Sequence, residues 1–353
     1  MPTSPTKTLD AKLARIVADP NCGDFILADA KDADMAFGLG ATGPKPGADP
    51  ATGPFRSIDE YRQQIREIVH QGLVDVMLMS ASTSEALAID EQLFAGSAVT
   101  PAVRMNDTTD IWLAAGSGGY ARQPALPFAT TSIAQAQFGH IDPPAGASRP
   151  AVDLGLFSLT LNDDATLDRE MLVAYGAFRA GAERARFRHF LEVFLPNAPG
   201  RVPSRETNAP PRDVARFLAD HVVRTLAGVP RAGRPVFLKI PYLGPEVTER
   251  LAAYDRTLVV GILGGGAGTT HDAFALVAEA KRHGARVALF GRKINAAEHQ
   301  LAFVTHLRAV ADDQLPPADA VKSYHAQLQA LRIAPRRSLD QDLERTPTSS
   351  AYG

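Results

Sequence analysis

The sequence predicts an α/β protein and, within that class, one (β/α)8 TIM barrel with an N-terminal capping helix and an extra C-terminal helix. Three observations lead to this prediction. Eight short apolar segments have strand-like patterns, and a helical pattern or a long loop follows each of them. Capping signals mark several helix starts. The length of 353 residues also suits one barrel, because barrels of this kind run past about 250 residues as a single unit.

Strand and helix segments alternate along the whole chain. The first five strands are expected at 24–29, 74–79, 102–106, 153–161 and 189–195, and the last three open the stretches 234–244, 258–270 and 284–294. Helices are expected at 8–19, 57–72, 165–186, 213–227, 245–254, 272–283, 296–310 and 318–331. This alternation places every carboxyl-terminal strand end at one face of the barrel, where the active sites of this fold lie.

Two capping boxes predict helix starts. In Ser57-Ile-Asp-Glu60 the serine hydroxyl and the glutamate carboxylate can each accept a hydrogen bond from the other residue's backbone N–H. Gly72 then ends this helix. The stretch Ser82-Thr-Ser-Glu85 repeats the pattern and predicts a second helix start.

Three segments fall outside the regular alternation. The Gly- and Pro-rich stretch 38–54 is too long for a plain connector, which favours a role at the active-site mouth. The stretch 107–152 is a long loop with scattered aromatic residues, and its composition fits a lid over the barrel mouth or a subunit-contact arm equally well. We expect a single domain over 1–335 and a loose, flexible tail over 336–353.

Composition and charge exclude several classes of partner. With 37 Lys and Arg against 39 Asp and Glu, the formal net charge is -2 and no basic face is indicated, so neither nucleic acid nor an anionic membrane is expected. No run approaches about 18 apolar residues and the N-terminus lacks a signal peptide, so we expect a cytoplasmic protein. The single cysteine, Cys22, rules out an internal disulfide. Assembly into a homo-oligomer stays open.

Lys239 is the first candidate for chemistry. It stands in the middle of the apolar stretch Arg234-Pro-Val-Phe-Leu-Lys-Ile-Pro-Tyr-Leu-Gly244. Burial disfavours a lone ammonium and lowers its pKa toward neutrality, and a neutral amine can attack a carbonyl. The alternative is a strand-end lysine whose ammonium reaches water along the side-chain stem. The downstream sequence favours the first reading.

That downstream sequence contains two glycine-containing strand ends. Gly264-Gly-Gly-Ala-Gly-Thr-Thr270 follows one strand and Gly291-Arg292 follows the next. One interpretation is a dinucleotide site with Arg292 and Lys293 on a 2′-phosphate, but that fold needs further strands beyond the second one. The favoured interpretation is a phosphate site of a barrel, formed by Gly264, Gly265, Gly266, Gly291 and Arg292.

Taken in order, residues 234–296 read as a strand with a lysine, a helix, a strand with a glycine-rich end, a helix and a strand ending in Gly-Arg. This order resembles the last three βα units of the class I, Schiff-base aldolases of the deoxyribose-phosphate and tagatose-bisphosphate aldolase (DeoC/LacD-type) superfamily. The resemblance implies an aldehyde-lyase that uses neither metal nor cofactor. It also implies an imine at Lys239 and a small phosphorylated carbonyl substrate whose phosphate is held by the seventh and eighth loops.

The resemblance extends to two carboxylates. Glu192 on the fifth strand matches a glutamate that shuttles protons in tagatose-bisphosphate aldolases, whereas its structural interpretation is an ion pair with Arg104 or another cation. Asp29, at the end of the first strand, matches an acidic position that binds substrate hydroxyls. The neighbouring Asp32 and Asp34 leave open which of the three carboxylates faces the site.

The fourth strand departs from the family pattern, because it offers neither the lysine nor the tyrosine that relatives carry. We expect Arg104, Asn106 or Asn162 to supply the missing polarity, with Arg104 and Asn106 as substrate-binding candidates. The nine histidines are scattered without ligand spacing, so no metal site is expected. Two rival functions are a phosphate-binding barrel isomerase with Glu192 as its base, and a non-catalytic sugar-phosphate-binding protein.

Overall fold

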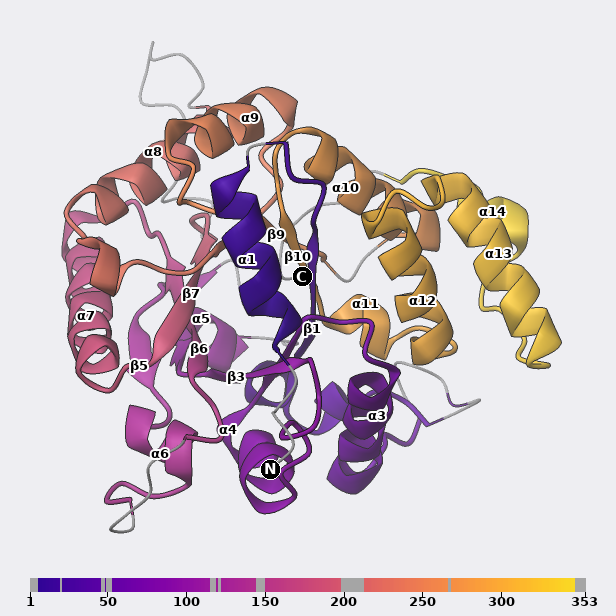
Figure 1. Ribbon diagram of the computed structural model, residues 1–353, viewed down its shortest axis with the longest axis horizontal. Helices are drawn as coiled ribbons and strands as arrows, with labels where there is room; N and C mark the ends of the chain where they lie inside the picture. The colour runs from indigo at the N-terminus through magenta and orange to yellow at the C-terminus, as the bar shows by residue number, and fades with distance from the viewer. Residues whose placement is uncertain are drawn as a thin grey trace.

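The computed structural model describes residues 6–19, 21–45, 48, 53–114, 119, 122–143, 150–197, 213–265 and 268–346. Eight parallel strands with helices between them form the predicted (β/α)8 barrel (Figure 1). In chain order the barrel strands are β1 (Ile26–Lys31), β2 (Val76–Met79), β3 (Thr100–Arg104), β6 (Leu154–Thr160), β7 (Arg188–Phe194), β8 (Leu238–Lys239), β9 (Gly261–Leu263) and β10 (Val287–Phe290).

The two ends of this sheet meet between β8 and β9. A parallel bridge joins Ile240 to Ile262, and the Ile240 N–H donates to the Gly261 carbonyl at 3.0 Å. Two residues earlier on each side, the Leu238 N–H donates to the Val259 carbonyl at 2.8 Å. These bonds place Lys239 in a strand that has a neighbour on each side.

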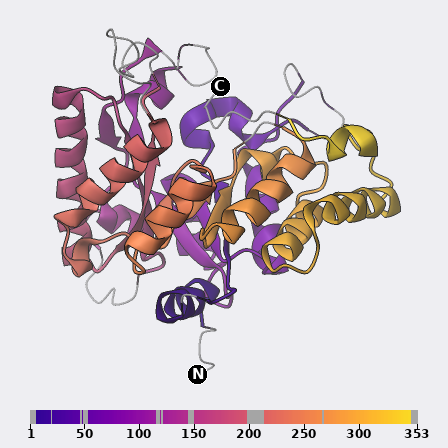
Figure 2. The same cartoon turned by 90° about the horizontal axis from the view of Figure 1, so that it is seen from above.

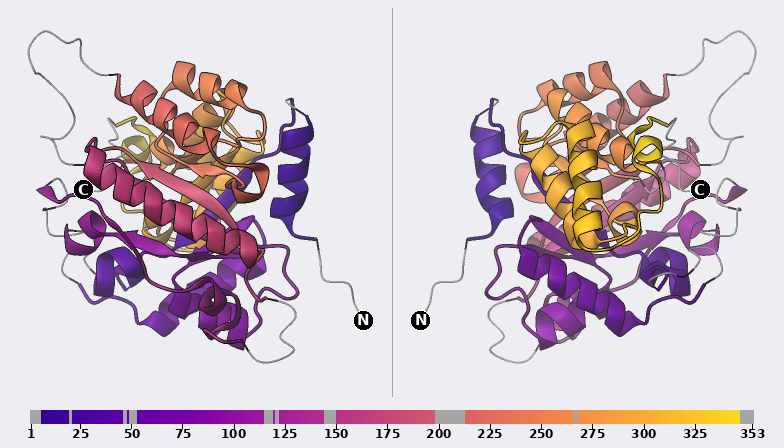
Figure 3. Two further views of the ribbon diagram at one scale, coloured as in Figure 1. Left: turned by 90° about the vertical axis from the view of Figure 1, so that its left-hand side faces the viewer. Right: turned by 90° about the vertical axis from the view of Figure 1, so that its right-hand side faces the viewer.

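The helices surround the barrel, and one covers an end of it. The longer helices are α1 (Thr8–Ala18), α3 (Ile58–Gln71), α7 (Ala165–Arg184), α8 (Val214–Ala227), α9 (Pro245–Tyr254), α10 (Thr270–Arg282), α12 (Gln300–Ala311) and α13 (Pro317–Ala330). Figures 2 and 3 show α1 apart from the ring of helices, at one end of the barrel. Its Leu9 belongs to the same apolar cluster as Ile26 and Val287, which start their strands, so α1 caps the amino-terminal end.

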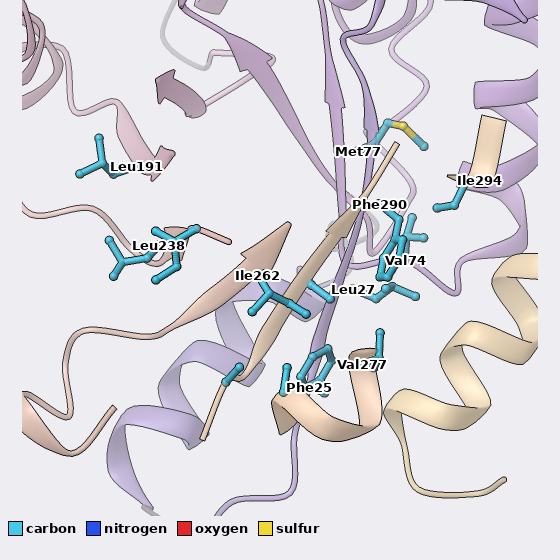
Figure 4. Close-up of a cluster of buried hydrophobic side chains, with 14 of the residues drawn as sticks. Phe25, Leu27, Val74, Met77, Leu191, Leu238, Ile262, Val277, Phe290 and Ile294 are labelled. Atoms are coloured by element: carbon cyan, nitrogen blue, oxygen red, sulfur yellow. The ribbon is translucent and has the colours of Figure 1, made fainter. Parts of the chain in front are cut away.

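Alternation along the strands separates two apolar layers. Ile26, Ala28 and Ala30 of β1 belong to the cluster inside the barrel, whereas Leu27 belongs to the larger cluster between the strands and the helices. Figure 4 shows this outer layer, in which Leu27 and other strand side chains lie beside Val277 of α10. The same alternation decides which polar residues near the strand ends face the barrel interior.

The first capping box is confirmed, and the second is wrong. Ser57 Oγ accepts from the Glu60 N–H at 3.2 Å, Glu60 Oε2 accepts from the Ser57 N–H at 2.6 Å, and Gly72 ends α3 in the left-handed region at a φ of 70°. Beyond β2, however, helix α4 (Ala81–Ser84) begins one residue before Ser82 and runs into a π-helical segment, Glu85–Asp90. The helix therefore starts directly at the strand end.

The stretch 107–152 contains secondary structure that its composition did not predict. Strand β4 (Asn106–Thr108) pairs antiparallel with β5 (Pro127–Ala129), and the short helices α5 (Thr109–Ala114) and α6 (Ile133–Phe138) follow the two strands. Ser132 and Gln135 form a capping box at the start of α6. Within the described residues, no helix combines the length and the apolar composition needed to cross a membrane.

The expected loose tail is wrong for residues 336–346. Helix α14 (Leu339–Leu343) begins with a capping box between Ser338 and Gln341. Its Asp342 is buried and accepts a hydrogen bond from the Thr270 N–H of α10 at 2.7 Å. The rest of the tail, 347–353, lies outside the described residues.

We expect Gly261→Ala to destabilise the barrel by about 1–3 kcal/mol, because a Cβ at this position would clash with the Leu238 carbonyl oxygen of β8. Urea unfolding measures the change. Gly228→Ala is the matched control, since a Cβ there meets no atom within 4 Å and the residue has a φ of -86°. Equal stability of the two variants would show that β8 and β9 do not need a glycine between them.

Candidate functional site

The side chains of three neighbouring strands form a polar row inside the barrel. Ser158 of β6 pairs in register with Glu192 of β7, and Glu192 pairs with Lys239 of β8. The Ser158 hydroxyl donates to Glu192 Oε2 at 2.6 Å, and Lys239 Nζ lies 2.6 Å from Glu192 Oε1. One carboxylate therefore joins a hydroxyl on one side to an amine on the other.

Burial makes this row costly unless its members are paired. Ser158 and Glu192 are fully buried and Lys239 is 5% exposed. Removing one charge of such a pair would leave the other uncompensated in the interior. The sequence left a choice between a partner for Glu192 at Arg104 and a role beside Lys239, and the structure places the carboxylate beside Lys239.

Asn106 fixes β6, the strand that carries Ser158 at one end of the row. Its Oδ1 accepts from the Ser158 N–H at 2.7 Å, and its Nδ2 donates to the Ser158 carbonyl at 3.0 Å. The amide predicted to bind substrate thus contacts the backbone of β6. Asn162 has a similar position, because its side chain makes two hydrogen bonds of 2.8 Å to the backbone of Ala125 in the long insertion.

Arg104 forms the centre of a second buried group. Its guanidinium lies 3.1 Å from Asp32 and 3.0 Å from Asp107, and its Nε donates to the Asn106 carbonyl at 2.9 Å. Burial raises the pKa of Asp107, and the Arg104 charge opposes this rise. Arg104 and Asp32 both line the cavity into which Lys239 opens.

This cavity has a volume of about 210 Å³. Its wall combines alanines and larger apolar residues with a few charged side chains. The lining residues are Ala30, Asp32, Ala33, Ala36, Phe37, Arg104, Lys239, Tyr242, Leu263, Gly264, Gly265, Asp272, Ala273, Leu276, Leu289, Gly291 and Arg292. Lys239 and the predicted anion-binding residues Gly264, Gly265, Gly291 and Arg292 therefore share one cavity.

Two of the predicted phosphate-site glycines have a packing reason. A Cβ on Gly264 would clash with the Phe290 ring, and a Cβ on Gly291 would clash with the Ala30 carbonyl. The Gly264 N–H already donates to the Leu289 carbonyl at 2.7 Å. Gly265 has a φ of +62° and open space around it, so its need for glycine is conformational. Gly266 lies outside the described residues.

The two cations after β10 lie differently. Arg292 lines the cavity, and its guanidinium carbon lies 5.7 Å from the centre of the Phe37 ring. Lys293 donates from Nζ to the Gly268 carbonyl at 2.7 Å, and burial lowers the pKa of Lys293 to about 8. Arg292 is thus placed to meet a ligand, whereas Lys293 holds the loop that follows β9.

Asp29 lies away from the cavity, on the outward side of β1. It shares that side with Leu27 and Lys31, and its carboxylate lies 3.5 Å from Lys31 Nζ. Burial raises the pKa of Asp29 to about 6 and lowers that of Lys31, which also donates to Gln300 Oε1 at 2.8 Å. The first-strand carboxylate at the cavity is instead Asp32, which follows Ala28 and Ala30 on the inward side.

Sequence reasoning missed Ser158 as a site residue, and it left Asp32 unassigned. Alternation along the strand could have found Ser158. In β6, Leu154 and Leu156 face the interior, so Ser158 two residues later does as well. Among the described residues, no three His, Cys, Asp or Glu side chains gather in a way that could hold a metal ion.

Comparisons with known proteins show the fold. No family model matches the sequence, and no curated protein matches it. Among solved structures, an archaeal fructose 1,6-bisphosphate aldolase covers 87% of this chain and 100% of its own, with a TM-score of 0.55 and 15% identity. A structural-genomics target from Corynebacterium glutamicum covers 89% of this chain and 100% of its own, with a TM-score of 0.54 and 17% identity.

A further archaeal fructose-1,6-bisphosphate aldolase was solved with its catalytic lysine covalently bound to the carbinolamine intermediate of the substrate. It covers 86% of this chain and 100% of its own, with a TM-score of 0.55 and 13% identity. The chain therefore shares the barrel fold of aldolases of the Schiff-base class, at an identity that shows the fold alone.

We expect Asp29→Ala to destabilise the protein by about 3–5 kcal/mol, because it leaves Lys31 buried without its carboxylate. Urea unfolding at neutral pH measures the change. Asp319→Ala is the matched control, since the ion pair of Asp319 with Lys322 is exposed and such pairs contribute about 1 kcal/mol or less. A loss no larger than that of the control would contradict the structural role of Asp29.

Proposed function

We propose that this protein is a class I aldolase, an aldehyde-lyase that forms an imine between Lys239 and the carbonyl of a small phosphorylated substrate. The single observation that carries the proposal is the row in which Glu192 lies 2.6 Å from Lys239 Nζ inside the barrel. The fold that the chain shares with a Schiff-base-forming fructose-1,6-bisphosphate aldolase supports it. The imine acts as the electron sink, so that the carbon–carbon bond breaks or forms without metal or cofactor.

Glu192 performs the proton transfers that imine formation needs. Its carboxylate takes a proton from the Lys239 ammonium, and the resulting amine attacks the carbonyl carbon. The attacking nitrogen loses a proton to the carbonyl oxygen, which becomes the hydroxyl of a carbinolamine. Glu192 then returns a proton to that hydroxyl, which leaves as water while the C=N bond forms. The Ser158 hydroxyl, donating to Oε2, keeps Oε1 directed at Lys239 throughout.

Asp32 takes the role that the resemblance assigned to a first-strand acid. It lines the cavity with Lys239, whereas Asp29 faces the outer layer. Its carboxylate is available to accept from a substrate hydroxyl and to remove its proton when the adjacent carbon–carbon bond breaks. The Arg104 guanidinium lies 3.1 Å from the Asp32 carboxylate and holds it at the cavity wall.

The anion end of the substrate lies at Arg292, with backbone donors from Gly265 and Gly291. Arg292 offers charge-assisted hydrogen bonds to a phosphate, and all three residues line the cavity of Lys239. The rival isomerase mechanism needs Glu192 as the base that removes a proton from carbon. That reading is less favoured because Ser158 and Lys239 each lie 2.6 Å from one of its carboxylate oxygens.

Borohydride reduction in the presence of candidate aldehydes and ketones tests the proposal. We expect a reduced adduct on Lys239, located by peptide mass spectrometry, and none on the exposed Lys322. Lys239→Met should abolish the adduct, and Glu192→Gln should slow its formation by about 10²–10⁴-fold because proton transfer is lost. If carbonyl compounds bind or turn over while Lys239 stays unmodified, the protein is an isomerase or a non-catalytic binder.

Arg292→Ala tests the anion end of the site. The loss of one or two charge-assisted hydrogen bonds, each of roughly 1.5–3 kcal/mol, should raise KM for a phosphorylated substrate by at least about tenfold. An unphosphorylated analogue should be nearly unaffected. Arg282→Ala, on the exposed side of α10, is the control. An equal loss for both substrates would assign Arg292 a structural role.

A further inference from the structure

We define residues 338–346 as the C-terminal clasp. This segment covers the start of α10, a helix that contributes residues to the cavity wall. It contains α14 and packs against α13 and α10. In Figure 1 the yellow helices α13 and α14 lie side by side, next to α10 and α12. The start of α10 follows the glycine-rich loop after β9, so the clasp reaches the region where the substrate phosphate is proposed to bind.

The clasp binds the first turn of α10 through several polar groups. Asp342 Oδ1 accepts from the Thr270 N–H at 2.7 Å, and the Glu344 carbonyl accepts from the Thr269 hydroxyl at 2.8 Å. His271 Nδ1 lies 2.6 Å from the Leu343 carbonyl oxygen. These contacts hold the N-cap residue Thr269 and the first two residues of α10 at the end of the glycine-rich loop.

The clasp also engages a carboxylate of the cavity wall. Asp272 lines the cavity, and its two oxygens accept from the Thr346 N–H at 3.0 Å and the Thr346 hydroxyl at 2.6 Å. Arg345 Nε lies 3.3 Å from the same carboxylate. Burial would raise the pKa of Asp272, but the hydrogen bonds from Thr346 and Thr269 outweigh it and hold the pKa below its ordinary value.

The clasp is itself anchored outside the cavity. The Asp342 carboxylate that caps Thr270 also lies 3.0 Å from His325 Nε2 of α13. Next to the clasp, the Arg336 N–H donates to Glu298 Oε1 at 2.9 Å. The segment that binds Asp272 is therefore itself held in place by α13.

We propose that the C-terminal clasp sets the anion affinity of the substrate site by holding Asp272 and the start of α10. This inference rests on the proposed phosphate site. With the clasp in place, Thr346 and Thr269 donate hydrogen bonds to the Asp272 carboxylate, and the Arg345 cation offsets its charge. Without it, the Asp272 carboxylate would keep only its hydrogen bonds from Thr269 and would lose the Arg345 cation, so it would repel a phosphate in the cavity that holds Arg292 more strongly.

Amide hydrogen exchange tests whether the clasp holds the start of α10. A chain ending at Arg337 lacks the clasp, and a chain ending at Thr346 keeps it and is the matched control. We expect the amides of Thr269, Thr270 and Asp272 to lose protection in the shorter chain only. If the shorter chain does not fold, Thr346→Val and Asp342→Ala in the full chain replace it. Unchanged protection would overturn the proposal.

The binding part is tested by calorimetric titration with inorganic phosphate, which requires no turnover. We expect the chain without the clasp to bind phosphate about tenfold more weakly or worse, and Asp272→Asn in that chain to restore most of the loss. Equal affinity of the two chains, or no recovery with Asp272→Asn, would overturn the proposal.

The proposed role of the clasp and the aldolase proposal can fail independently of each other. If the full chain yields no Lys239 adduct but its phosphate affinity still depends on the clasp, the aldolase proposal fails and the clasp is supported. If the adduct forms and the phosphate affinity is the same with and without the clasp, the aldolase proposal stands and the proposed role of the clasp is refuted.

Discussion

An ammonium and a carboxylate paired at 2.6 Å inside the barrel are the interaction on which the rest of the site depends. Taking each charge out of water costs several kcal/mol, which the pair offsets only with good geometry and further hydrogen bonds. The structure supplies both. The register of β6, β7 and β8 places Ser158, Glu192 and Lys239 in one row, and Asn106 holds the backbone of the outer strand. The site is thus a consequence of strand register.

The same register depends on how closely the strands approach. Gly261 lets β9 approach the Leu238 carbonyl of β8, which brings the two ends of the sheet together beside Lys239. Gly291 makes a similar approach possible between the end of β10 and the Ala30 carbonyl of β1. Two of the glycines that suggested a phosphate site, Gly264 and Gly291, are therefore needed by the barrel as well. Packing and ligand binding act on the same residues here.

The barrel and the lysine could be predicted from the sequence because both leave local signals. Strand-length apolar segments alternate with helix caps, and Lys239 interrupts an apolar strand. Asp29 was misplaced for a physical reason: β1 is apolar on both sides, so Ile26 and Leu27 do not reveal which side faces inward. Only the neighbouring strands decide that Asp32 reaches the cavity and Asp29 does not.

The C-terminal clasp could not be predicted for a different reason. Its hydrogen bonds join Asp342, which accepts, and Thr346, which donates, to residues more than seventy positions earlier, and such contacts leave no periodic pattern in the sequence. Ser158 is an intermediate case. Alternation along β6 predicts that it faces inward, but its partnership with Glu192 requires the register between two strands.

Oxygen exchange tests the central claim most directly. If Lys239 forms an imine, each cycle of its formation and hydrolysis replaces the carbonyl oxygen of the bound substrate with one from water. For dihydroxyacetone phosphate carrying ¹⁸O at its carbonyl, the account predicts label loss faster than the exchange in buffer, and loss at only the buffer rate with Lys239→Met. Retention of the label by a wild-type protein that binds the compound, or equal loss with both proteins, would contradict an imine at Lys239.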